Sequence, residues 1–132
     1  MFEGEIQSCA TRFHELLALD HSQREPWGSR HGLAFATYAL QHPGAFPAAT
    51  LDRSWIALHR IYGCGDDPGR VFERFRREGN RARWDSPPRP TPPEQFPRVT
   101  IADLANFEAE TYAEMLDQWA RATLDWYEKR KT

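Results

Sequence analysis

The most apolar stretch of the chain covers residues 29–43 and reads SRHGLAFATYALQHP. Read as a helix, its three- and four-residue spacing places four side chains on one stripe: His31, Phe35, Tyr38 and His42. Small and apolar residues fill most of the remaining helix surface, which is typical of a helix buried on several sides. Pro43 ends the helix because it lacks an N–H. We therefore expect this helix to be the element around which the fold is organised.

Four further segments carry apolar residues at helical spacing between polar or proline-containing breaks. Asp67 and Pro68 precede one of them as a cap and a first-turn residue, and Gly79 follows it. In the last segment, one apolar seam is interrupted by Glu108 and consists of Leu104, Tyr112, Met115, Trp119, Ala122 and Trp126. The predicted helices cover residues 2–19, 29–43, 48–62, 67–78 and 100–129.

Residues 80–98, which we name the strap, are rich in proline and cannot form a regular helix or strand. We expect the strap to run extended over the surface, with Trp84 and Phe96 as anchors. No other segment shows the alternation of a strand. The sequence therefore predicts an all-α fold: an antiparallel bundle of four to five helices with a long proline-rich surface loop, in a single domain over residues 1–132.

Charge and cysteine content narrow the function classes. The formal net charge is −2, which gives no global attraction to nucleic acid or to an anionic membrane. No apolar run approaches the ~18 residues of a membrane span, and the first residues lack the basic start and apolar core of a signal peptide. Cys9 and Cys64 show no CxxC spacing. These features indicate a cytoplasmic protein with free thiols.

Several segments together resemble an uncharacterised bacterial family of unknown function. The resemblance rests on RFHELLAL, HGLAFATYALQHPG, SWIALHRIYG, PPRPTPP, TIADL and DQWARATLDWY, and its most specific part is the HxxxxxxYALQHP element. Many members of that family begin with a CxxC-type segment, which this chain lacks. The resemblance implies one small domain and no established activity.

Helical geometry brings three of the five histidines together. Folding the helix over 29–43 back on the helix over 48–62, about a turn near residue 45, places Phe35 level with Trp55 and His31 level with His59. We expect Phe35 to pack on Trp55. Folding the helix over 2–19 back on the helix over 29–43, about residue 25, brings His21 near His31.

We therefore predict that His21, His31 and His59 converge at one end of the bundle, with Cys64 just beyond. Three imidazoles with a further ligand form a plausible site for zinc or another first-row transition metal. Glu108 is the candidate general base for catalysis there. The alternatives are histidines that bond buried polar groups or face water, and a Glu108 that complements the helix dipole. Gln41 and His42 are expected to satisfy the last carbonyls of their helix.

Two functions from different classes follow. The first is a small cytoplasmic helical protein with a metal or small-ligand site formed by the histidines, which would act on an unknown small ligand. The alternative is a non-catalytic interaction or accessory protein that uses the strap and the Arg-rich segment over residues 70–83 to bind a protein partner. Nucleic acid is the less favoured partner for that segment, because Glu73 and Glu78 can pair with its arginines.

Overall fold

The prediction of an all-α fold is confirmed. A computed structural model describes residues 3–21, 30–79, 83–93, 97, 100–101 and 109–128, and within these ranges it contains helices and no strand. Side chains within α1 and α5 are described for residues 9–18 and 111–128. The α-helices are α1 (Glu3–His21), α2 (His31–Gln41), α3 (Ala48–Leu58), α4 (Pro68–Glu78) and α5 (Ala109–Glu128). A 3-10 turn (Pro43–Ala45) joins α2 to α3, and a π-helical turn (His59–Gly63) extends α3.

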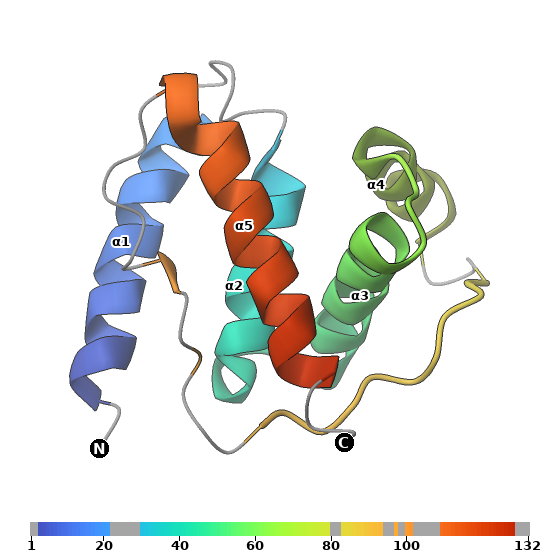
Figure 1. Cartoon of the computed structure of the whole chain (residues 1–132), viewed down its shortest axis with the longest axis horizontal. Coiled ribbons are helices and arrows are strands. Elements are labelled where there is room, and N and C mark those ends of the chain that lie inside the picture. The colour runs from blue at the N-terminus through green and yellow to red at the C-terminus, as the bar shows by residue number, and fades with distance from the viewer. Residues whose placement is uncertain are drawn as a thin grey trace.

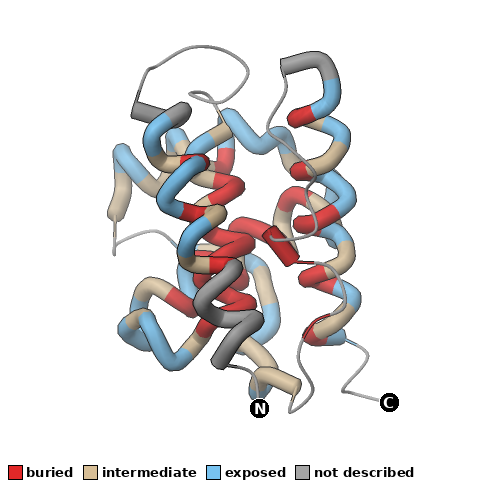
Figure 2. The backbone as a smooth tube through the Cα atoms, turned by 90° about the vertical axis from the view of Figure 1, so that its left-hand side faces the viewer, coloured by how far each residue is buried: buried red, intermediate tan, exposed pale blue. Residues whose placement is uncertain are grey.

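Helix α2 is the central element, as its apolar sequence predicts. It lies between α1 and α3 and behind α5 (Figure 1), and its residues from Leu33 to Gln41 are buried except Phe35, which is half-buried. The rings of Phe13 in α1 and Tyr38 in α2 stack with centroids 4.0 Å apart. Figure 2 shows buried positions on the inner sides of the helices that surround α2. Burial on several sides explains why this helix carries almost no charge.

The ends of α4 follow their sequence signals. Asp67 precedes the helix, and its Oδ2 accepts a hydrogen bond from the backbone N–H of Arg70 at 3.1 Å. Pro68 occupies the first helical position, where a missing N–H has no cost. Gly79 ends the helix with a φ of 56°, a left-handed conformation that glycine adopts without strain. The predicted cap and stop are therefore correct.

The buried side of α5 differs from the predicted seam. The buried residues are Tyr112, Leu116, Trp119, Ala120, Thr123, Leu124 and Tyr127, whereas Met115, Ala122 and Trp126 are only partly buried. Thr123 and Tyr127 carry polar groups and face inward because those groups have partners there. The hydroxyl of Tyr127, for example, donates to the carbonyl of Leu40 at the end of α2. Leu104 and Glu108 lie outside the described residues.

The predicted contact between Phe35 and Trp55 does not form. The ring of Phe35 faces Phe13 and Phe46, with centroids 6.2 and 5.4 Å away. Trp55 is buried, and its ring packs against Tyr127 of α5, 6.1 Å away. The prediction used only the height of each residue along its helix, whereas the two side chains point to different neighbours.

The described part of the strap, residues 83–93, runs from beside α4 to below α3 (Figure 1) and contacts the domain at several points. The ring of Trp84 lies 4.8 Å from that of Phe75 and under the guanidinium of Arg74 at 4.3 Å, so the predicted anchor is present. The indole N–H of Trp55 donates to the carbonyl of Pro87 at 2.9 Å. Further along, a salt bridge of 2.8 Å joins Arg89 and Asp52. Phe96, the second predicted anchor, lies outside the described residues.

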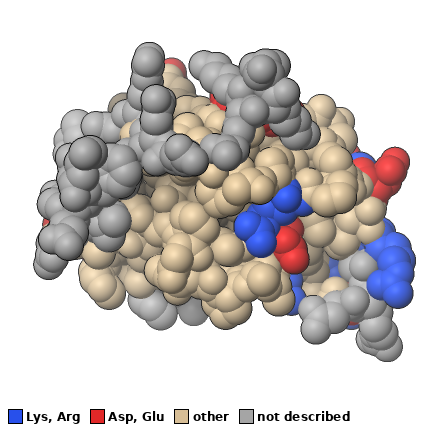
Figure 3. All heavy atoms as spheres, turned by 90° about the horizontal axis from the view of Figure 1, so that it is seen from below, with Lys and Arg blue, Asp and Glu red and all other residues tan. Residues whose placement is uncertain are grey.

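Charged side chains of α4 are paired within the helix, as its sequence indicates. Glu73 pairs with Arg76 at 2.7 Å, and Glu78 pairs with Arg74 at 3.1 Å and Arg77 at 3.2 Å. Figure 3 shows one face of the molecule on which basic and acidic side chains also lie side by side, within a mostly uncharged surface. Among the described helices, none is both long enough and apolar enough to cross a membrane.

Candidate functional site

The predicted site residues lie in different surroundings. His31 is the first residue of α2, is exposed, and has its ring centroid 6.3 Å from that of Phe35. His59 is half-buried in the π-helical turn, where its Nδ1 lies 3.2 Å from Oγ of Ser86. His21 ends α1, but its side chain is not among those described, and Glu108 also lies outside the described residues.

A metal centre is not visible among the side chains that the structure describes. No three His, Cys, Asp or Glu residues of this set gather closely enough to hold a metal ion. Because the predicted set includes His21, whose side chain is not described, the convergence of His21, His31 and His59 stays a prediction. His31 instead lines a pocket that His59 does not reach.

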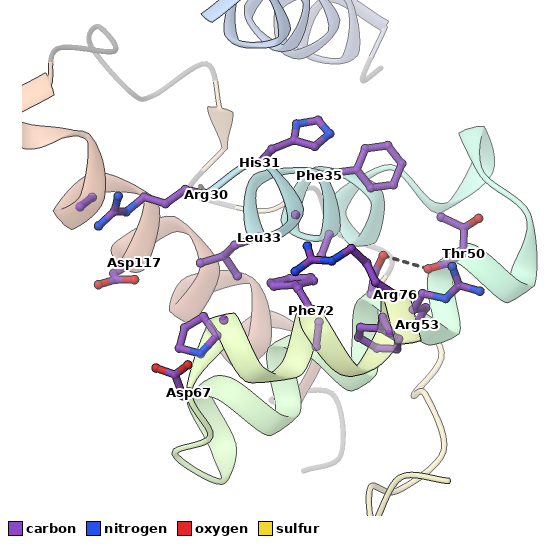
Figure 4. A pocket seen from close by; sticks show the side chains of 18 residues that line it. Arg30, His31, Leu33, Phe35, Thr50, Arg53, Asp67, Phe72, Arg76 and Asp117 are labelled. Atoms are coloured by element: carbon purple, nitrogen blue, oxygen red, sulfur yellow. Dashed lines mark hydrogen bonds between the residues drawn. The ribbon is translucent and has the colours of Figure 1, made fainter. Parts of the chain in front are cut away.

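This pocket lies between α2, α3 and α4, with one side formed by the beginning of α5 (Figure 4), and has a volume of about 1050 Å³. A volume of this order is enough for a small organic molecule. Aromatic and aliphatic side chains form much of its wall, among them Leu33 and Phe35 from α2 and Phe72 and Phe75 from α4. Helices that are distant in the sequence therefore form the site.

Gly32 permits the close approach of α2 and α4 beside the pocket. A Cβ atom at this position would lie 3.0 Å from the ring of Phe72. This separation is shorter than an ordinary contact between carbon atoms. The Phe72 ring therefore rests directly on the backbone of α2 and closes the pocket on that side.

Charged groups are distributed unevenly around the apolar wall. Arg30, Arg53 and Arg76 come from the start of α2, from α3 and from α4, respectively. In Figure 4, Asp67 and Asp117 lie toward the opposite end of the pocket from Arg53, and Arg30 lies beside Asp117 at that end. The guanidinium of Arg53 lies over the ring of Phe75, 5.8 Å from its centroid. One end of the pocket is therefore basic and aromatic.

The acidic residues of the pocket already have hydrogen-bond donors. Asp67 caps α4, as described above, and Oδ1 of Asp117 accepts the hydroxyl proton of Tyr62 at 2.7 Å. Burial, reinforced by the hydrogen bond to Asp117, raises the pKa of Tyr62 above its ordinary value of 10. The tyrosine thus remains a neutral donor, and the charge of Asp117 is partly compensated.

The arginines differ in how firmly they are held. Arg76 pairs with Glu73 on the surface, and this hydrogen bond lowers the pKa of the Glu73 carboxyl. The side chains are 72% and 54% exposed, so the pair is screened by water and contributes little to stability. A guanidinium in such a pair can turn toward an anion in the pocket at small cost.

Sequence reasoning found His31 but missed the rest of the pocket wall. Arg53, Phe72 and Arg76 belong to helices whose separate sequences show only amphipathic patterns. The one local signal was Gly32, a helix-destabilising residue inside an apolar helix. Glycine at such a position indicates that another part of the chain approaches the backbone.

Comparison with known proteins shows the family of the chain. Residues 2–128, nearly the whole chain, match the model of a family of unknown function. This match confirms the resemblance seen in the sequence. The chain matches no curated protein and no solved structure.

Proposed function

Because this chain belongs to DUF5946, a family of unknown function, we propose its function from the pocket alone: it binds a small organic molecule that combines an apolar body with an anionic group. One observation carries the proposal. The pocket joins an aromatic wall, formed by Phe35, Phe72 and Phe75, to the guanidinium groups of Arg53 and Arg76, which come from two separate helices. Apolar pockets with a few convergent charged groups are the usual form of a small-molecule site.

The apolar body of the ligand would lie against Phe72 and Phe75. Both side chains are half-buried, so a ligand would remove further apolar surface from water. Such burial is worth about 25 cal/mol per Å² of apolar surface. The aromatic wall therefore supplies affinity for a hydrophobic group, and this affinity has low specificity.

The anionic group would lie between Arg53, whose guanidinium lies over the ring of Phe75, and Arg76, the next residue of α4. Guanidinium groups bind carboxylates and phosphates through paired N–H donors, and proximity to apolar surface strengthens such hydrogen bonds. Toward the far end, Asp67 and Asp117 stand with Arg30, so the charges there partly offset one another. This distribution favours a ligand with its charge at one end.

A metal-dependent form of this function retains the predicted ligands His21, His31 and His59 for zinc or another first-row transition metal, with Glu108 as general base. The support is that His31, one of the three, lines the proposed ligand pocket. Elemental analysis of protein purified without an affinity tag tests this form. A metal content near one per chain, lost in the His31→Ala/His59→Ala variant, would support it, and metal-free protein would end it.

The alternative function, binding of a protein partner by the strap and the Arg-rich helix, has weaker support. Pro87 and Pro88 of the strap and Arg77 of α4 are exposed and could contact a partner. However, Trp84 and Arg89 of the strap hold it to its own domain, which favours a structural role. A cytoplasmic location remains part of the proposal, supported by the two free cysteines Cys9 and Cys64.

Binding of two fluorescent probes of similar shape tests the pocket. 8-Anilino-1-naphthalenesulfonate carries an anionic group, and N-phenyl-1-naphthylamine lacks it. We expect each to bind at one site per chain, with Phe72→Ser weakening both. Arg53→Gln combined with Arg76→Gln should weaken the sulfonate about tenfold, or 1.4 kcal/mol, and leave the neutral probe nearly unchanged.

Arg77→Gln is the matched control, since Arg77 lies on α4 and does not line the pocket. It should leave the affinity for both probes unchanged. Near-ultraviolet circular dichroism of each variant checks that the fold is intact. Equal losses for both probes in the arginine variant, or no saturable binding to the native protein, would overturn the proposal.

A further inference from the structure

A cysteine and a histidine meet at the end of α3, away from the pocket. The π-helical turn His59–Gly63 has a backbone hydrogen bond of 3.1 Å from the N–H of Cys64 to the carbonyl of His59. This five-residue step is longer than that of an α-helix and places Cys64 one turn beyond His59. The Sγ atom of Cys64 lies 3.9 Å from Nδ1 of His59. That separation is within reach of a hydrogen bond that involves sulfur.

The imidazole of His59 is held in place from two sides. Its ring packs on that of Trp55, with centroids 5.6 Å apart and an angle of 31° between the planes. Ser86 of the strap places its Oγ 3.2 Å from Nδ1. The ring therefore has a fixed orientation, with Nδ1 directed toward both the serine hydroxyl and the thiol.

Arg60 adds positive charge and fixes the turn that carries the thiol. Its Nε donates to Oδ2 of Asp66 at 2.7 Å, and its Nη1 donates to the carbonyl of Asp85 at 2.8 Å. The hydrogen bond to Asp66 raises the pKa of Arg60, so the guanidinium keeps its positive charge beside the turn that carries Cys64.

The thiol is open to a reagent. Cys64 is exposed and stands between Gly63 and Gly65. A Cβ atom at Gly65 would meet nothing within 4 Å, while one at Gly63 would lie 3.3 Å from the imidazole of His59. The flanking residues thus leave the sulfur approachable and leave room for the ring beside it. Cys9, by contrast, is fully buried.

We propose that Cys64 is a site of reversible modification by small disulfides, with His59 as the proton acceptor. Nδ1 takes the proton of the thiol, so the neutral ring must carry its own proton on Nε2. The thiolate attacks one sulfur of the disulfide, a bond forms between it and Sγ, and the original sulfur–sulfur bond breaks. The leaving thiolate takes the proton from the imidazolium. Sγ is oxidised and the leaving sulfur is reduced, so no other oxidant is needed.

Reaction of the full-length protein with dithiodipyridine, followed by release of thiopyridone, tests this site. We expect a fast phase that corresponds to one thiol per chain, followed by slow reaction of Cys9. Cys64→Ser should abolish the fast phase. His59→Gln should slow it about tenfold at neutral pH, while His14→Gln, at an exposed histidine of α1, should leave it unchanged.

Chemical rescue separates proton transfer from a merely structural role. In His59→Ala, added imidazole should restore much of the fast phase, because it can occupy the space of the lost ring and accept the proton. Ser86→Ala should keep or increase the rate, since the serine hydroxyl competes for the same nitrogen. Glutathione disulfide should add one glutathionyl group at Cys64, and dithiothreitol should remove it.

The reaction is repeated with and without EDTA. A fast phase that appears only after chelation would show that Cys64 binds a metal, and would overturn the proposal. The proposal is also overturned if Cys64 reacts no faster than glutathione under the same conditions, or if His59→Gln leaves the reaction rate of Cys64 unchanged. Because the thiol lies outside the pocket, none of these outcomes depends on the probe-binding results.

Discussion

The indole N–H of Trp119 donates a hydrogen bond to the side-chain carbonyl of Gln41, 3.1 Å away, inside the contact between α2 and α5. The side-chain nitrogen of Gln41 donates to Oγ1 of Thr123 at 2.9 Å, and this hydroxyl donates to the carbonyl of Trp119, also at 2.9 Å. All three residues are buried. The polar groups of this core region therefore satisfy one another in a closed set.

Replacement of Gln41 by Leu should destabilise the protein by about 1–3 kcal/mol, because the indole N–H and the threonine hydroxyl each lose a buried partner. Urea unfolding measures the change. In the Trp119→Phe background the same replacement should cost less, because the indole N–H, one of the two groups that lose a partner, is already absent. Equal costs in both backgrounds would show that the hydrogen bond between Gln41 and Trp119 contributes nothing to stability.

The stability of the protein should decrease as the pH falls below 6.5, the ordinary pKa of a histidine side chain. Burial lowers the pKa of His42, which is 8% exposed. The unfolded chain then binds a proton more readily than the folded one, so stability is complete above pH 6.5 and is lost as the pH falls toward the lower folded-state value.

Unfolding measured from about pH 7.5 to about pH 5.5 checks this sign. The decline should be smaller in His42→Asn and unchanged in His14→Asn, because His14 is exposed. If all three proteins lose stability in parallel, other groups cause the decline and His42 is not its source.

High pH should destabilise the protein through its buried tyrosines. Burial raises the pKa of Tyr127 above its ordinary value of 10, and the hydroxyl donates to the carbonyl of Leu40. Above pH 10 the unfolded chain loses this proton while the folded chain keeps it, so stability falls as the pH rises. Tyr127→Phe should reduce the slope of thermal stability against pH in this range. An unaltered slope would assign the effect to other groups.

Trp55 should contribute both to the core and to the position of the strap. Trp55→Ala should cost about 3–5 kcal/mol, the usual range for a buried aromatic residue. Trp55→Phe keeps most of the packing but loses the hydrogen bond to Pro87, so it should cost about 1 kcal/mol. Hydrogen exchange at the strap amides should become faster in Trp55→Phe.

Arg89→Ala provides the comparison for that experiment. It removes the salt bridge to Asp52, whose side chain is 58% exposed, so its effect on global stability should be small. It should nevertheless accelerate exchange at the neighbouring amide of Thr91. Unchanged exchange in both variants would mean that neither contact holds the strap.

The helices could be predicted because their signals are local. Asp67, Pro68 and Gly79 define α4 through properties of single residues, and the apolar pattern around Tyr38 predicts a helix buried on several sides. The backbone hydrogen bonds of a helix join residues that are close in the sequence. Each helix therefore follows from its own segment.

The site could not be predicted in the same way because it depends on rotation of each helix about its axis. Counting residues from a turn gives the positions of Phe35 and Trp55 along their helix axes, but not the direction in which each side chain points. Phe35 faces α1 and Trp55 faces α5, and only these long-range contacts decide that. Gln41 likewise bonds to side chains of α5, partners that its place at the end of α2 does not indicate.

The π-helical turn His59–Gly63 also fixes how the chain enters α4. The wide turn already holds one residue more than an α-helical turn, so an insertion of one further residue there would not be absorbed by it. Every later residue would then be rotated by about 100° around the axis of α3, the angle that one residue spans in an α-helix. Phe72 would leave the backbone of Gly32, and the pocket would lose one wall although no side chain that lines it had changed. The shape of the pocket is thus determined partly by the length of the chain at a point outside it.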